Sequence, residues 1–255
     1  MTQTTNDARS PMASPATDWI SPASVKNYAR LTGVLMLVSI LAGGFGEAYV
    51  QSKVVVSGDA NATARNVLAS VSLFRWGFAS YLVEALCDIT LAWLFYLLLR
   101  PVHRHLALLA LCFGLVSTAV YACAELFYFA ALVTLNSAAA LRAFSPEQLN
   151  ALALLCLRLS GYGGWIFLAF YGVPSVIRGY LIARSTYLPK VLGILLIVGG
   201  MGFVARDFAV VLVPALASGL LLAPMAVAGV ALTAWLIVKG IDPLEWQRAE
   251  IKPWT

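Results

Sequence analysis

The segment YLVEALCDITLAWLFYLLLR, which runs from Tyr81 to Arg100, decides the class of this protein. It is long and apolar enough to cross a bilayer as a helix, which takes about 20 residues. It nevertheless carries two carboxylates, Glu84 and Asp88, four positions apart, so both lie on one face of the helix. Because charges at membrane depth are costly, we expect these residues to face the interior of a helix bundle.

The composition extends this prediction to the whole chain. Of 255 residues, 61% are hydrophobic and only 11% are charged, and the mean hydropathy is +0.84. Soluble domains are about 45–50% apolar and about 25% charged. The apolar runs are continuous, whereas the strands of a membrane barrel alternate apolar and polar residues. Backbone groups in lipid must be satisfied within each segment, so we predict an all-α, polytopic membrane helix bundle.

Six apolar runs are long enough to span a membrane. In chain order they cover residues 31–50, 76–99, 106–132, 160–182, 188–211 and 215–238. These runs predict one transmembrane bundle over residues 28–240. A polar N-terminal segment, 1–27, is expected to be a disordered cytoplasmic tail. Residues 241–255 are expected to form a short cytoplasmic C-terminal tail.

Cap signals predict short interfacial helices on the outer side of the bundle. A turn that ends at Asp59 precedes an amphipathic stretch, and we predict a surface helix over 61–74. Ser145 and Gln148 form a capping box, which predicts a second helix running toward a bend near Gly161. On the other side, Asp242 repeats the cap pattern and predicts a short cytoplasmic helix.

The basic residues give the orientation. With six spans both termini lie on one side, and that side holds eleven of the 17 Lys and Arg residues. The eleven are Arg9, Lys26, Arg30, Arg100, Arg104, Arg178, Arg184, Lys190, Lys239, Arg248 and Lys252. The opposite side holds Lys53, Arg65, Arg75, Arg142, Arg158 and Arg206. The excess predicts a multi-pass protein of the cell membrane with both termini in the cytoplasm.

Several chemistries lack the residues they need. The only histidines, His103 and His105, lie in the predicted cytoplasmic loop RPVHRH, and the sequence has no HExxH motif and no phosphate-binding loop. We therefore expect no metal site and no cofactor. The net charge of +5 belongs to loops of a membrane protein and does not indicate nucleic-acid binding. Membrane lipids are the expected partners, and the sequence leaves the oligomeric state open.

Polar residues gather on two neighbouring spans. Tyr81 lies three residues before Glu84 and extends its face, and Tyr121 and Glu125 share a stripe of the third span. Arg158, near the start of the fourth span, is the expected counter-charge, because a guanidinium keeps its proton. The predicted pocket residues are Tyr81, Glu84, Asp88, Tyr121, Glu125 and Arg158, with Glu47 and Arg206 as secondary members.

Three functions fit such a cluster. The leading hypothesis is a membrane protein that binds or moves a small molecule or ion, as in transport, through an acidic cavity open to the outer face. The alternatives are an intramembrane enzyme and a structural accessory subunit. The enzyme would use a carboxylic acid as proton donor on a lipid or isoprenoid-like substrate. The structural subunit would use the polar network only to hold helices together.

Three stretches carry a resemblance to a known family. They are SKVVVSGDANATARNVLASVSLFRWG, CDITLAWLFYLLLRPVHRHLALLA and YGVPSVIRGYLIARSTYLPKVLGILLIVGG, between Ser52 and Gly200. In pattern and order the chain resembles a bacterial family of integral membrane proteins classified as domain of unknown function four-three-eight-six. The resemblance implies a multi-pass bacterial membrane protein and transfers no activity. It also singles out Asp88 and the SGDA turn as the first positions to test.

The predicted orientation has a direct test. A reporter that is active only outside the cytoplasm should give no signal when fused after Thr255 and a strong signal when inserted near Asn61. The reverse pattern would contradict the orientation and the outward-facing cavity that depends on it.

Overall fold

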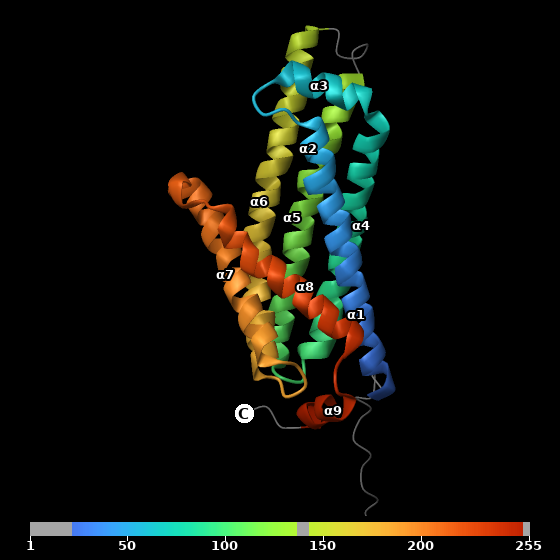
Figure 1. Ribbon diagram of the computed structural model, residues 1–255, viewed down its shortest axis with the longest axis vertical. Helices are drawn as coiled ribbons and strands as arrows, with labels where there is room; N and C mark the ends of the chain where they lie inside the picture. The colour runs from blue at the N-terminus through green and yellow to red at the C-terminus, as the bar shows by residue number, and fades with distance from the viewer. Residues whose placement is uncertain (1–21, 137–142, 252–255) are drawn as a thin grey trace, which may run out of the picture.

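The computed structural model describes residues 22–136 and 143–251, and this part of the chain is helical without any strand (Figure 1). Its elements are α1 (Pro22–Gly43), the π-helical η1 (Gly44–Val50), α2 (Gln51–Val54), α3 (Ala60–Ala69), α4 (Val71–Leu99), α5 (Arg104–Asn136), α6 (Pro146–Arg184), α7 (Lys190–Leu212), the short 3₁₀ segments η2 (Pro214–Leu216) and η3 (Gly219–Leu222), α8 (Ala223–Val238) and α9 (Pro243–Ile251). Of the predicted tail, residues 1–21 lie outside the described residues, and residues from Pro22 onward already belong to α1.

Six helical stretches of the described chain are long and apolar enough to cross a membrane, which confirms the predicted number of spans. The first combines α1, η1 and α2 into one continuous stretch, Ser24–Val54; the others are α4, α5, α6, α7 and the η3–α8 stretch Gly219–Val238. The protein is therefore an all-α, multi-pass membrane protein.

The fourth span differs from the prediction. The capped helix that begins after Ser145 and the predicted span from residue 160 are one uninterrupted helix, α6, of 39 residues. The capping box at Ser145 and Gln148 is formed as expected. The glycines near Gly161 do not interrupt the helix, and Gly163 instead packs directly on Ala124 of α5. At about 1.5 Å per residue α6 is about 58 Å long, so it extends well beyond a hydrocarbon core of about 30 Å.

The helices form a bundle with two distinct ends. In Figure 1, α1, α4, α5 and α6 run along the long axis, α3 lies across one end, and α9 lies across the other end. We call these the α3 end and the α9 end. The oblique α7 and α8 lean against the bundle, and α8 crosses in front of it toward α1 (Figure 1). Close backbone approaches at Gly172–Gly200 and Gly179–Gly193 join α6 to α7.

The predicted surface helix is shorter than expected. Asp59 caps α3 by accepting a hydrogen bond from the Ala62 amide at 2.8 Å, as the sequence indicated. The helix ends at Ala69, because Ser70 leaves the helical conformation, and Phe74 belongs to the first turns of α4. The segment 61–74 is thus a surface helix followed by the start of a span.

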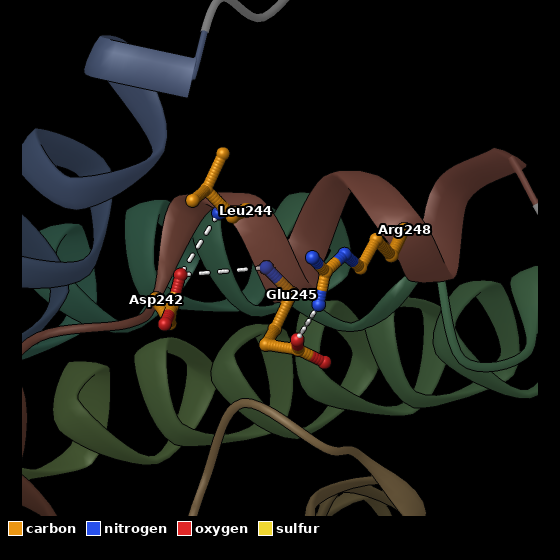
Figure 2. A network of polar contacts seen from close by, with 4 residues as sticks. All are labelled: Asp242, Leu244, Glu245 and Arg248. Carbon is orange, nitrogen blue, oxygen red and sulfur yellow. Dashed lines mark hydrogen bonds and ion pairs between the residues drawn. The ribbon is translucent and has the colours of Figure 1, made fainter.

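The C-terminal helix α9 is anchored on the end of α4. Asp242 caps it through hydrogen bonds from the amides of Leu244 and Glu245, and Arg248 pairs with Glu245 one turn later (Figure 2). The cap confirms the predicted short helix. The Trp246 indole donates a hydrogen bond of 3.0 Å to the Leu98 carbonyl, which also accepts one of 2.8 Å from the Tyr187 hydroxyl.

The α9 anchor predicts a graded loss of stability. Trp246 is 2% exposed, so Trp246→Ala should cost about 3–5 kcal/mol. Trp246→Phe, which removes the hydrogen bond and part of the buried ring but keeps an aromatic side chain, should cost less, about 1–3 kcal/mol. Thermal unfolding of the purified protein in one detergent measures both. Leu244→Ala, at an exposed position of the same helix, is the matched control and should leave the melting temperature unchanged. Equal losses for all three variants would show that α9 is not anchored by this residue.

Candidate functional site

A cavity of about 400 Å³ lies at mid-depth of the bundle, between α1, α4, α6, α7 and α8. Most of its wall is apolar, with Leu91 of α4, Phe203 of α7 and Met225 of α8 among the lining residues. Its polar groups are Ser39, Glu84, Asp88, Tyr171, Ser175 and Arg178. The two carboxylates of the opening sequence segment therefore line the same cavity.

Asp88 is the best-supported of these carboxylates. It is 7% exposed, and the Ser39 hydroxyl of α1 donates a hydrogen bond of 3.0 Å to its Oδ1. Arg178 of α6 lies close enough to interact electrostatically with the same carboxylate. Asp88 is thus hydrogen-bonded to α1 and interacts electrostatically with Arg178 of α6, with which it forms no close ion pair in the described chain.

Arg178 lines the cavity although the sequence pattern did not single it out. The count of basic residues placed it in a cytoplasmic loop, whereas the structure places it inside α6 with 5% exposure. Its guanidinium lies over the Phe95 ring at 4.9 Å and against Gly114 of α5, where a Cβ atom would come within 2.9 Å of Nη2. Its Nε is buried without a hydrogen-bond partner among the described residues. Arg178 is the counter-charge of the cavity.

Glu84 stands one helical turn from Asp88 toward the α3 end. Its Oε2 accepts a hydrogen bond of 2.7 Å from the Tyr121 hydroxyl of α5. Its carboxylate also rests against Gly43, where a Cβ atom would lie only 2.5 Å from Oε1. Glu84 therefore belongs both to the cavity wall and to the packed interface between α4 and α5.

Glu47, Tyr81 and Glu125 form a second polar group beyond Glu84. The Tyr81 hydroxyl donates to Glu47 Oε2 at 3.2 Å, and the Gln51 amide donates to the same oxygen at 2.6 Å. Glu125 is 6% exposed and interacts electrostatically with Glu47 and Glu84. The structure thus brings Glu47, Tyr81, Glu84, Asp88, Tyr121 and Glu125 into one neighbourhood.

Arg158 is not part of this neighbourhood. Its side chain is exposed on α6 and makes no ion pair in the described chain. It lies 26 residues, or about 39 Å, from the α9 end of α6, which is more than the roughly 30 Å of hydrocarbon. The expectation that Arg158 balances the carboxylates was wrong, because the helix is longer than the predicted span.

Arg206 also stands apart, on α7. It pairs with Asp207 at 3.2 Å and lies over the Trp165 ring at 5.7 Å. Asp207 is 8% exposed and is therefore buried rather than solvated. This pair neutralises itself and contributes no charge to the cavity.

The rim of the cavity faces sideways. Ile40 of α1 is 42% exposed and Val230 of α8 is 62% exposed, and Ala226 beside it is also exposed. The cavity therefore opens between α1 and α8 on the lateral surface of the bundle, the surface that lipid covers in a membrane protein. No group of three metal-binding side chains occurs among the described residues.

Comparison with known proteins places the chain by sequence. A family model described as Domain of unknown function (DUF4386) matches residues 31–240. No curated protein and no solved structure matches the chain.

Two arginines of one helix provide a test of the site. Arg178→Met should destabilise the protein by roughly 3 kcal/mol, because it leaves a buried carboxylate without its counter-charge. Arg158→Met, the same change on the exposed face of α6, should alter stability by at most about 0.5 kcal/mol. Thermal unfolding in detergent measures both. Adding Asp88→Asn to Arg178→Met should restore part of the loss, and a double variant that is less stable than Arg178→Met alone would contradict the pairing.

Proposed function

The chain belongs to the family described as Domain of unknown function (DUF4386), and we propose that this membrane protein binds a small amphipathic molecule that enters its cavity from the lipid. The apolar body of the ligand lies between α1, α7 and α8. Its polar end, which is cationic or rich in hydrogen-bond donors, lies against Glu84 and Asp88. The lateral cavity is the observation that supports this proposal.

The shape of the cavity favours an amphipathic ligand over a free ion. A cavity of about 400 Å³ falls within the range of roughly 300–1,000 Å³ that small-molecule pockets occupy, and such pockets are mostly apolar with a few convergent polar groups. An ion alone would leave the apolar walls on α7 and α8 without a partner. A rim between two lipid-facing helices admits molecules that dissolve in the membrane.

The charges of the cavity favour a cationic end. Glu84 and Asp88 stand against one guanidinium, that of Arg178, so the formal balance is one negative charge in excess. An uncompensated charge in an apolar interior is costly, and a bound ammonium group removes that cost. The N–H groups of the ammonium can donate hydrogen bonds to the carboxylate oxygens, each of which accepts more than one hydrogen bond.

The proposed orientation adds a direction. With both termini in the cytoplasm, the α3 end is outside, and Glu84 lies on the outer side of Asp88. Arg178 then lies toward the cytoplasm, so the cavity is acidic on its outer side and basic on its inner side. This polarity supports movement of a cationic ligand between the outer leaflet and the cavity.

Binding of dodecylamine, compared with dodecanol, tests the proposal. The two probes share one alkyl chain, and only the amine carries a positive charge. We expect the protein in detergent to bind dodecylamine at least tenfold more tightly, as measured by titration calorimetry, because a charge-assisted hydrogen bond contributes about 1.5–3 kcal/mol. Asp88→Asn combined with Glu84→Gln should abolish the preference. Equal affinity for the two probes would refute the charge argument.

A cavity-filling variant shows where the probe binds. Gly229 lines the cavity, and a Cβ atom there meets only Ile40 Cδ1, at 3.8 Å, so the backbone has room for a side chain and Gly229→Leu should fill the entrance. This variant should lose dodecylamine binding. Gly161→Leu, on an open part of α6, is the matched control and should bind normally. Chemical conversion of the probe, detected by mass spectrometry, would favour the enzyme alternative instead.

A further inference from the structure

Two hydrogen-bonded pairs of carboxyl and phenol groups lie between the cavity and the surface near the α3 end, and together with Glu125 we call them the chain of polar groups. It begins with the pair Glu47 and Tyr81, joined by a hydrogen bond of 3.2 Å, and ends with the pair Tyr121 and Glu84, joined by one of 2.7 Å. The Tyr81 and Tyr121 rings meet edge to face with centroids 6.0 Å apart. The first pair and the second pair are therefore neighbours in the core.

Glu125 stands between the two pairs without a hydrogen-bond donor. It is 6% exposed, and its Oε2 is buried with no partner in the described part of the chain. The titratable groups that face it are Glu47 from η1, Tyr81 and Glu84 from α4, and Tyr121 and Tyr128 from α5 itself. The α6 side chain that packs on Tyr121 is Phe167, which is apolar. Burial of a charged carboxylate without a hydrogen-bond donor is costly, and this cost favours the form of Glu125 that carries a proton.

The other end of the chain reaches the surface. Glu47 is exposed, and it lies seven residues before Val54, the last residue of the first span. At about 1.5 Å per residue this places it about 10 Å from the end of that helix. The span of 31 residues is about 46 Å long, so Glu47 lies close to the edge of a hydrocarbon core of about 30 Å.

The helix around Glu47 has an unusual backbone conformation and two glycines that let Tyr81 and Glu84 pack against it. Residues 44–50 form a π-helical segment, a rare conformation that occurs mostly at functional positions. Gly46 in this segment lets the Tyr81 ring approach, since a Cβ atom would come within 2.5 Å of Tyr81 Cε1. Gly43, just before it, accommodates Glu84 in the same way. The two glycines thus bring both ends of the chain of polar groups against one helix.

We propose that Glu47, Glu125 and Glu84, together with Tyr81 and Tyr121, conduct protons between the outer surface and the cavity. The arrangement suits protons rather than a metal ion, because these carboxyl groups do not form a metal-binding group in the described structure. The inference rests on the proposed function in one respect, that the proton delivered to Glu84 replaces the cationic end of the ligand.

The exchange balances in atoms and charge. A proton from external water binds the Glu47 carboxylate. Glu125 gives its proton to the Tyr121 oxygen as the Tyr121 hydroxyl proton passes to Glu84, and Glu125 then receives the Tyr81 hydroxyl proton as Tyr81 takes the proton from Glu47. At rest the two hydroxyls donate to Glu84 and Glu47, so the Tyr81 hydroxyl must turn toward Glu125 for the transfer, and the Tyr121 hydroxyl turns back afterwards. Glu84 becomes neutral, and its ion pair with the ligand ammonium breaks. One proton has entered the cavity for each cation released, so the charge of the cavity is unchanged.

The first experiment needs no ligand. Infrared spectra of the purified protein at neutral pH should show the carbonyl band of a protonated carboxyl group, and the band should shift in D₂O because the path exchanges with water. Glu125→Gln, which keeps the shape and carries no transferable proton, should remove the band. Glu147→Gln, at an exposed position of α6, is the matched control and should keep it. If the Glu125→Gln variant keeps the band, the inference is overturned.

The second experiment measures the coupling. Dodecylamine binding should weaken about tenfold for each pH unit of acidification while one proton is exchanged per molecule bound. Glu84→Gln should bind with an affinity that no longer depends on pH. In Glu125→Gln, proton release on binding, followed with a pH indicator in stopped flow, should be at least tenfold slower than in the Glu147→Gln control.

The two experiments separate the two proposals. If the protein binds no dodecylamine at any pH, the proposed function fails, and the proton path is judged by the infrared band alone. If binding occurs at the same affinity at every pH, the coupling between path and cavity is refuted although the cavity binds its ligand. If Glu125→Gln releases protons as fast as the control, protons reach the cavity by another route and the path is refuted.

Discussion

The charge of Asp88 in an apolar bundle is the constraint on which the arrangement of the helices depends. A buried carboxylate is stable only when protein groups replace the water that it loses, and such groups must come from other helices. Here Ser39 comes from α1 and Arg178 from α6. Three spans far apart in the sequence are thereby fixed at one depth, and the space that remains between them and α8 is the cavity.

Glycines make these meetings sterically possible. Gly43 gives room to the Glu84 carboxylate, and Gly114 gives room to the Arg178 guanidinium. A side chain at either position would overlap with the charged group beside it and would displace that group. Glycines also allow α6 and α7 to pack closely, because pairs of glycines let the two backbones approach each other. Small residues therefore serve packing between helices and the placement of polar groups at once, as is common in membrane bundles.

The structural features that depend on local sequence pattern could be predicted from the sequence. Span number, the cap at Asp59 and the capping box at Ser145 follow from apolar length and from spacing, and the structure has all three. The sequence did not predict the counter-charge, because helix length and register decide which arginine is buried. Arg178 lies near the end of a run that appeared to stop at residue 182, so it was counted with the loop. Its spacing of three from Ser175 and seven from Tyr171 places it on one stripe with two other cavity residues, and that signal was available.

The buried charged groups of the described chain are of two kinds. Arg206 with Asp207, and Arg100 with Glu250, are closed pairs in which each charge has its partner within 3.2 Å. Such pairs can hold helices together. Glu125 and Arg178 are buried as well, but neither forms an ion pair in the described part of the chain. A fold that only needed stability would gain from apolar residues at these positions. Glu125 and Arg178 lie on either side of Glu84 and Asp88, where a ligand and a proton, as proposed above, would compensate buried groups that have no ion-pair partner.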